Sequence, residues 1–234
     1  HSFPTRRSSD LFGFGGRMVE NIDGKPKIVM DSERNVNALD RALDLVADGF
    51  YCQDLKSKVD YDFNSVASNL FTSKQVLFTT AFPHSLKSRS EKCDFNYGVC
   101  PFPKYDENQE SYHSMMATWG TLMTTIPASA SDPERSGVIL DALAFDSYKN
   151  LMEPYYETYL NQKGARNKDS AEMLKIIRET RVINVGQMFG WTGSVTSSIT
   201  SLVEKGNASV ASAIAKAKPS IEKSIDKTLT AMAE

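Results

Sequence analysis

The sequence has few of the residues on which several classes of protein depend. Its 234 residues include only three cysteines, three histidines and two tryptophans. Cys52, Cys93 and Cys100 are too few for a disulfide framework, and they show neither the C-x-x-C nor the Cys/His spacing of a zinc site. The sequence therefore predicts no metal and no other cofactor, and it leaves open a bridge between Cys93 and Cys100.

Charge of one sign and long apolar runs are also missing. The formal net charge is -2 and the isoelectric point is near 6.0. A nucleic-acid-binding protein needs a basic face to neutralise phosphates, so the composition argues against a nucleic-acid partner. No apolar run approaches the roughly 20 residues of a membrane-spanning helix. With 41% hydrophobic and 24% charged residues, the chain is of ordinary globular composition, long enough for one large domain or two small ones.

Recognisable catalytic motifs are absent from the sequence. The glycines in residues 13–16 do not complete G-x-G-x-x-G, because Met18 stands where the third glycine would be. His84 and His113 fit no spacing typical of a catalytic triad, and an exposed or hydrogen-bonded histidine is the simpler interpretation. The sequence therefore gives no reason to predict a nucleotide site or an enzyme.

The first part of the chain carries clear local signals. Asp23-Gly24 is a strong two-residue turn signal, so residues 17–30 are predicted to form a β-hairpin, with Pro26 placing the second strand at an edge. Asp31 is predicted to cap a helix that buries apolar residues at helical spacing, namely Val36, Leu39, Leu43 and Val46.

Strands and helices alternate in the predictions for the rest of the chain. The expected elements are a helix within residues 60–75, strands at residues 75–80, 94–102 and 115–126, a mostly buried helix capped by Asp132, a helix starting near Asp169, and amphipathic helices from Thr196 onward, before and after Pro219. Such alternation favours an α/β fold with at least one mixed sheet.

Four stretches of the sequence occur in an order that resembles one family. They are G-F-G-G-R-M-V-E-N-I-D-G-K-P-K-I-V-M-D, V-L-F-T-T-A-F-P, Y-G-V-C-P-F-P-K-Y-D-E-N-Q-E-S-Y and D-S-A-E-M-L-K-I-I-R. This order is similar to the later portion of extracellular solute-binding proteins of carbohydrate ABC transporters, of the maltose-binding-protein type. The likeness covers residues 12 to about 217.

The resemblance implies a two-lobed α/β fold, the periplasmic-binding-protein type II fold, truncated at the amino terminus. It implies that residues 12–100 form a first part of the carboxyl lobe, residues 101–160 a returning segment of the amino lobe with the hinge crossings, and residues 161–234 a helical second part of the carboxyl lobe. Residues 1–11 lack structural periodicity and resemble translated sequencing-adapter sequence, so they are interpreted as a non-native leader. The signal segment and the opening of the amino lobe would then lie upstream.

The same resemblance implies capture of a solute without any chemical conversion. The expected ligand is a sugar or oligosaccharide, held by hinge closure and delivered to the permease subunits of an ABC transporter. The expected location is the periplasm or the outer face of the cytoplasmic membrane, with membrane attachment only through the permease or a lipid anchor missing from this chain.

Sugar-binding sites use flat aromatic faces against pyranose C–H groups and planar polar groups for the hydroxyls. By resemblance, Phe82 follows a strand that commonly turns a side chain into the cleft, Trp119 lies on the returning strand, and Trp191 lies after a helix. These three residues are the first candidates for ligand binding, and the second group is Phe189, Tyr112 and Thr118. For each aromatic residue the alternative is packing in the core.

Two other functions stay open at this point. One is a carbohydrate-active hydrolase that uses Asp106 or Glu107 beside Tyr105, although paired catalytic carboxylates cannot be recognised from spacing alone. The other is a helical interaction module that uses the segment from Thr196 onward. Solute capture is favoured over both, because it alone accounts for the order of the elements and the lack of a catalytic motif.

Overall fold

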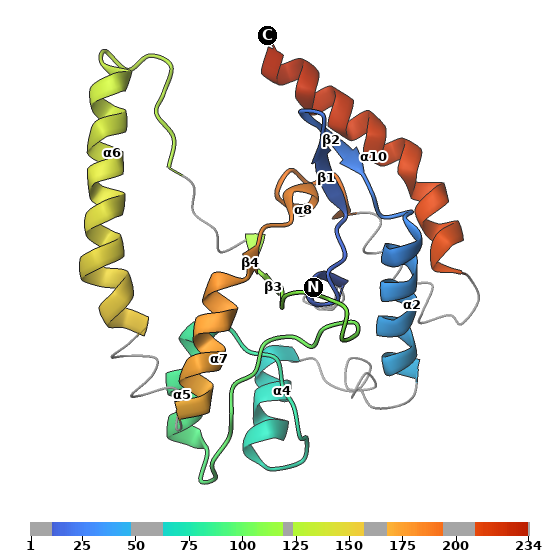
Figure 1. Ribbon diagram of the computed structural model, residues 1–234, viewed down its shortest axis with the longest axis vertical. Helices are drawn as coiled ribbons and strands as arrows, with labels where there is room; N and C mark the ends of the chain where they lie inside the picture. Colours follow the sequence, from blue (N-terminus) through green and yellow to red (C-terminus); the bar gives the residue numbers. More distant parts are fainter. Residues whose placement is uncertain (1–10, 48–62, 119–123, 157–167, 194–208, 234) are drawn as a thin grey trace. The chain divides into compact units, whose positions relative to one another are not determined.

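The computed structural model describes residues 11–47, 63–118, 124–156, 168–193 and 209–233 (Figure 1). The chain forms two compact units. Unit 1 comprises residues 1–63, 101–121 and 176–234, and unit 2 comprises residues 64–100 and 122–175. The polypeptide passes from one unit to the other after residues 63, 100, 121 and 175. Among the described residues, no helix combines the length and the apolar character needed to cross a bilayer.

Unit 1 opens with the hairpin that the sequence predicts. Strands β1 (Val19–Ile22) and β2 (Lys25–Ile28) pair antiparallel, with Val19 opposite Ile28. Asp23 and Gly24 form the turn with φ angles of 55° and 78°. Both lie in the left-handed region that a two-residue hairpin turn requires, and this explains why Asp-Gly is a reliable signal.

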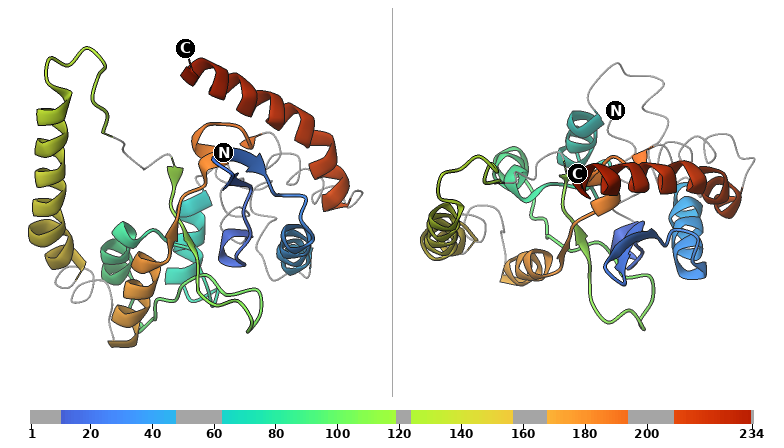
Figure 2. Two further views of the ribbon diagram at one scale, coloured as in Figure 1. Left: turned by 45° about the horizontal axis from the view of Figure 1, so that its top comes forward. Right: turned by 90° about the horizontal axis from the view of Figure 1, so that it is seen from above.

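Helix α10 (Val210–Ala233) covers one strand of this hairpin. It packs against β2 and against helix α2 (Glu33–Ala47), and Figures 1 and 2 show it beside the hairpin. The fully buried side chains of the shared core include Leu11, Phe12, Met30, Ile214 and Ile221. Leu11 therefore belongs to the core, although the sequence places it at the end of the predicted leader. Helix α10 includes the amphipathic helix predicted after Pro219, but it begins at Val210 and continues through this proline. The earlier helix, predicted from Thr196 onward, begins outside the described residues.

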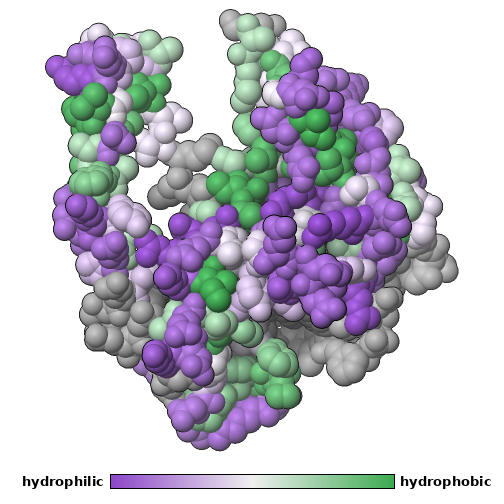
Figure 3. All heavy atoms as spheres, viewed as in Figure 1, coloured by the Kyte–Doolittle hydropathy of each residue, from purple (hydrophilic) through white to green (hydrophobic). Residues whose placement is uncertain are grey.

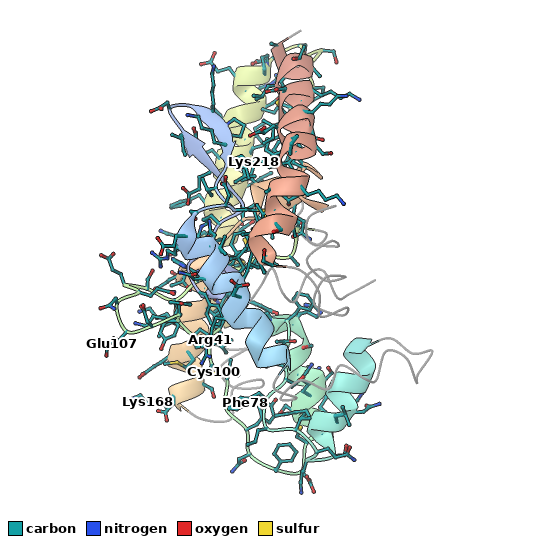
Figure 4. The ribbon with its side chains drawn as sticks, turned by 90° about the vertical axis from the view of Figure 1, so that its right-hand side faces the viewer. Arg41, Phe78, Cys100, Glu107, Lys168 and Lys218 are labelled. Atoms are coloured by element: carbon teal, nitrogen blue, oxygen red, sulfur yellow. The ribbon has the colours of Figure 1, made fainter. Side chains whose placement is uncertain are left out.

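The start of α2 differs from the prediction. The hydroxyl of Ser32 accepts a hydrogen bond from the backbone N–H of Asn35, so Ser32 rather than Asp31 caps the helix. Asp31 instead forms an ion pair with Lys218 of α10, which is labelled in Figure 4. Hydrogen bonding to Lys218 lowers the pKa of Asp31, and the same bond raises the pKa of Lys218. The ion pair thus joins the beginning of α2 to the middle of α10.

This ion pair should make a small contribution to stability that depends on pH. A lowered carboxylate pKa stabilises the fold above the ordinary value of about 4, and the gain disappears as the pH falls through the lowered value. A raised lysine pKa stabilises the fold below the ordinary value of about 10.4, and this gain disappears as the pH rises through the raised value. Both side chains are about one third exposed or more. Solvent screening therefore limits the expected cost of Asp31→Asn to about 1 kcal/mol.

Urea unfolding of the wild type and Asp31→Asn at neutral and at strongly acid pH measures this contribution. The wild type should be more stable at neutral pH, and the two proteins should coincide once the carboxylate of Asp31 is protonated. An equal difference at both pH values would contradict the assignment to the charge of Asp31.

A short parallel ladder completes the described part of unit 1. Strands β3 (Ser114–Met115) and β4 (Arg181–Val182) pair parallel, with Ser114 opposite Arg181. Helix α8 (Val185–Met188) follows β4 and packs against β1. The strand predicted at residues 115–126 is thus confirmed only at its beginning, and residues 119–123 lie outside the described part of the chain.

Unit 2 consists mainly of helical segments and contains an aromatic cluster. Its helical segments are α4 (Phe63–Thr72), η1 (Pro83–Ser85), α5 (Leu86–Lys92), α6 (Pro133–Ser147), η3 (Tyr148–Met152) and most of α7 (Lys168–Glu179). The rings of Phe71, Phe95 and Tyr97 contact one another, with centroids 5.5 to 6.5 Å apart. The hydroxyl of Tyr97 donates to the backbone carbonyl of Leu86 at 3.2 Å, so the cluster is fixed to α5.

Helix α6 begins as the sequence predicts but is not buried. The carboxylate of Asp132 accepts a hydrogen bond from the backbone N–H of Arg135 at 2.9 Å, which confirms the predicted cap. None of the residues of α6, all of which the structure describes, is buried, and the side chain of Val138 is 66% exposed. An apolar helix sequence indicates that a partner surface is needed but does not specify one, so the prediction of burial is wrong.

Two predicted strands of unit 2 are also wrong. Residues 75–80 and 94–102 contain no strand, and Leu77 and Phe78 are 79% and 81% exposed. A β-prone run needs a neighbouring strand for its backbone groups, and within the described residues nothing pairs with either segment. The described sheets have two strands each, so the two-lobed α/β fold and its lobe boundaries stay a prediction.

Candidate functional site

Two stacked aromatic rings form the best-defined candidate site in unit 1. The rings of Phe189 and Trp191 lie with their centroids 4.8 Å apart and their planes inclined by 13°. Trp191 is 5% exposed and belongs to the core, whereas Phe189 is 41% exposed. Of the two, therefore, Phe189 is the ring that is substantially accessible to a ligand. We call this pair the Phe189–Trp191 stack.

Trp191, the buried ring of the stack, is anchored by a hydrogen bond. The indole Nε1–H of Trp191 donates a hydrogen bond to Oγ1 of Thr228 at 2.9 Å, and this threonine lies on α10. The hydroxyl of Thr228 in turn donates to the carbonyl of Ser224 one turn earlier. A buried indole N–H with a partner and a packed ring has little freedom to move. Phe189 thus rests on a rigid support.

The turn after α8 sets the position of Phe189. Asn184 caps α8 by accepting a hydrogen bond from the N–H of Gln187 at 3.1 Å, and the N–H of Phe189 donates to the carbonyl of Val185. Gly190 has a φ of +71°, a left-handed conformation that glycine adopts without strain. This reversal brings residue 191 back under residue 189.

The segment that carries Phe189 exposes other apolar side chains. Ile183 is 46% exposed and Val185 is 39% exposed, and both are close to Phe189 in the chain. In the space-filling view, apolar atoms gather over the region of α8 (Figure 3). Such a surface can cover the C–H face of a sugar ring, and it can equally contact other apolar groups.

The other predicted site residues of unit 1 are less informative. Tyr112 is half-buried, and Nζ of Lys104 lies 5.5 Å from the centre of its ring. Thr118 is half-buried just beyond β3. Trp119 lies outside the described residues. Within the described part of the chain, no hydrogen bond or ring contact joins Tyr112 or Thr118 to the Phe189–Trp191 stack.

Phe82 belongs to unit 2 and stands at the start of η1. Its ring is 39% exposed and stacks on the imidazole of His84, with centroids 5.5 Å apart and planes inclined by 7°. Phe82 precedes η1 with an extended backbone (φ -85°, ψ 145°), and the stack joins its ring to a residue within the turn. Phe82 is therefore accessible, as a ligand-binding residue must be.

The acidic loop that raises the possibility of a hydrolase has a structural role. The Oδ1 atom of Asp106 accepts hydrogen bonds from the backbone N–H groups of Asn108 and Gln109, at 3.0 and 3.1 Å. This is the local pattern by which aspartate holds a turn. Glu107 is exposed and points outward from the loop (Figure 4). The Asp106 carboxylate is thus engaged with its own backbone.

A second group of residues in unit 1 was not predicted as a site. Arg17, Arg34 and His113 come from the segment before β1, the first turn of α2 and the segment before β3, and we call them the basic cluster. Burial and then the positive charges of Arg17 and Arg34 lower the pKa of His113. Burial also lowers the pKa of Arg17, which Glu20 raises and Arg34 lowers. No local motif links these residues in the sequence.

Within the part of the chain that the structure describes, no three His, Cys, Asp or Glu side chains are arranged to hold a metal ion. No family model matches the chain, and no curated protein is significantly similar to it in sequence. What the Phe189–Trp191 stack and the basic cluster do must therefore follow from their own chemistry.

Proposed function

We propose that the chain binds a sugar or oligosaccharide outside the cytoplasmic membrane and delivers it to the permease of an ABC transporter by hinge closure, without any chemical conversion. The observation that carries the proposal is the Phe189–Trp191 stack, in which an anchored indole supports an accessible ring. The order of motifs that resembles the carbohydrate-binding family supports the same function.

Rigidity of the stack favours ligand binding over incidental exposure. An accessible ring with fixed orientation loses little conformational freedom when a pyranose ring packs on it. The division into two units, with four passages of the chain between them, supplies the parts that a hinge mechanism needs. The engagement of Asp106 with its own backbone gives the alternative of a hydrolase no comparable support.

Isothermal titration of the full chain with neutral sugars such as glucose, maltose and maltotriose tests the proposal. Phe189→Ala should weaken the affinity for the best ligand about fivefold, because an aromatic face contributes on the order of 1 kcal/mol. The fold should survive, since Phe189 is 41% exposed. Phe78→Ala removes an 81% exposed phenylalanine of unit 2 and serves as the matched control, with unchanged affinity expected.

Two results would overturn the proposal. One is the absence of heat, and of any change in tryptophan fluorescence, with every neutral sugar tested. The other is release of a coloured product from a chromogenic glycoside, since this would identify a hydrolase. Equal affinities of the wild type and Phe189→Ala would keep sugar binding but exclude Phe189 from the site.

A further inference from the structure

The basic cluster has a geometry that calls for an anion. The guanidinium of Arg34 lies against Gly15, two residues before Arg17, and the side chain of Gln109 joins Gly13 to Ser111, two residues before His113, so three separate segments of unit 1 meet here. We propose that the basic cluster binds an anionic oxygen group of a small ligand, with the chemistry shared by carboxylate, phosphate and sulfate. This inference does not rest on the proposed function, because it concerns residues outside the Phe189–Trp191 stack.

The first argument is the balance of charge. Arginine stays protonated in proteins, so Arg17 and Arg34 carry two positive charges that repel each other. Among the described residues, no carboxylate forms an ion pair with either guanidinium. Glu20 is the acidic group whose charge acts on Arg17, and the charges that act most strongly on His113 are those of the two arginines. A bound anion would relieve the repulsion between the two guanidinium groups.

The second argument is that the donors are held in place. Nη1 of Arg17 donates to the carbonyl of Gly16 at 2.8 Å, and the guanidinium lies 5.4 Å from the centre of the Phe12 ring. The backbone N–H of Arg17 donates to Oδ1 of the buried Asn35 at 3.0 Å. Because the backbone and one nitrogen are fixed, the remaining N–H groups of Arg17 keep a defined direction.

Gly15 makes room for the second guanidinium. A Cβ atom at this position would lie 2.7 Å from Nη2 of Arg34 and 3.4 Å from the side-chain amide of Gln109. The φ of Gly15 is +77°, so its conformation also favours glycine. Arg34 therefore lies directly over backbone that carries no side chain.

Buried Gln109 fixes the neighbouring segment. Its amide nitrogen donates to the carbonyls of Gly13 and Ser111, at 2.9 and 2.7 Å, and its amide oxygen accepts from the N–H of Tyr105 at 3.0 Å. These bonds hold the segment of His113 beside the glycine segment that precedes Arg17. The basic cluster is thus supported by hydrogen bonds between segments far apart in the chain.

His113 supplies a polar group without a partner. Its Nε2 lies 3.3 Å from Oγ of Ser111, whereas its Nδ1 is buried and has no hydrogen-bond partner among the described residues. Burial disfavours the charged imidazole, as do the facing charges of Arg17 and Arg34, and the lowered pKa of His113 reflects both effects. An anion placed against the two arginines would oppose these charges and raise the pKa of His113.

Titration calorimetry of the full chain at low ionic strength tests the inference. The probes are inorganic phosphate, sulfate and glucuronate, with glucose as the neutral analogue of glucuronate. At least one anion should bind saturably, and the affinity should fall as salt is added. Saturation by glucuronate alone would assign the site to a sugar carboxylate, whereas saturation by phosphate or sulfate alone would assign it to a free oxyanion.

Arg34→Gln should weaken the affinity for the best anion by at least about tenfold, since it removes charge-assisted hydrogen bonds. Arg34 is exposed, so the variant should fold. The matched control is Arg41→Gln, which removes the same charge from an exposed position of α2 (Figure 4) and should leave the affinity unchanged. Equal losses of affinity in both variants would mean that the overall charge of the protein, and not the basic cluster, attracts anions. This result would overturn the proposal.

A proton NMR titration of the imidazole of His113 provides a second measurement, with its signals assigned by His113→Gln. Arg17 and Arg34 are the charged groups that act on His113. A saturating anion should offset their charges and so raise the pKa of His113. An unchanged pKa at saturation, or no saturable binding of any anion, would overturn the inference. If neutral sugars bind but no anion does, the proposed function stands and the anion site is excluded. If an anion binds but no neutral sugar does, the anion site stands and the proposed function is excluded.

Discussion

Replacing Trp191 by alanine is expected to lower the free energy of unfolding by about 3–5 kcal/mol, the usual cost of removing a large buried aromatic side chain. Trp191 is 5% exposed and contributes to the core of unit 1. The substitution removes the support of the Phe189 ring and leaves a cavity between α8 and α10. Sugar affinity should fall together with stability, because Phe189 would lose its fixed orientation.

Urea unfolding followed by far-UV circular dichroism measures this effect without relying on tryptophan emission. Trp191→Phe is the matched variant, since it keeps an aromatic ring and loses the hydrogen bond to Thr228. The hydroxyl of Thr228 retains its bond to Ser224, so Trp191→Phe should cost only about 1–2 kcal/mol. If Trp191→Ala were as stable as Trp191→Phe, the anchoring role of the indole would be wrong.

Asn35→Ala is expected to cost about 2–4 kcal/mol, because a single side chain satisfies two backbone groups. Asn35 is 5% exposed. Its Oδ1 accepts from the N–H of Arg17, and its Nδ2 donates to the carbonyl of Val29. Alanine would leave both backbone groups without these partners, and the two ends of the hairpin would lose their connection to α2.

The control for this variant lies two residues away. Asn37 is on the exposed side of α2, and Asn37→Ala should change the free energy of unfolding by no more than about 0.5 kcal/mol. Both substitutions make the same chemical change in the same helix, so the comparison isolates the hydrogen bonds of Asn35. A similar midpoint of urea unfolding for the two variants would show that these bonds contribute little.

Local signals in the sequence predicted the elements that depend on neighbouring residues. The hairpin turn at Asp23-Gly24 and the cap of α6 at Asp132 are confirmed, because each is specified by backbone geometry within a few residues. The predictions for residues 75–80 and 94–102 failed because a strand exists only with a partner. Hydrophobic character alone could not reveal whether such a partner forms.

The candidate site was predicted in part. The sequence placed Trp191 in the first group of candidates and Phe189 in the second, but only the structure shows that one supports the other and which is accessible. The basic cluster escaped prediction because its three members are far apart in the chain. The unusual glycines of residues 13–16 were the nearest signal, since Gly15 lies where the side chain of Arg34 passes. A glycine that fits no nucleotide motif can still mark a close approach of a side chain.

The different exposure of two cysteines provides a way to observe the proposed hinge. Cys93 is buried, whereas Cys100 is exposed, no disulfide joins them, and Cys100 is the last residue before the chain passes from unit 2 into unit 1 (Figure 4). With Cys52 replaced by serine, a thiol-reactive fluorophore should attach at Cys100 alone. Its emission would then report, in real time, whether a ligand changes the surroundings of this crossing.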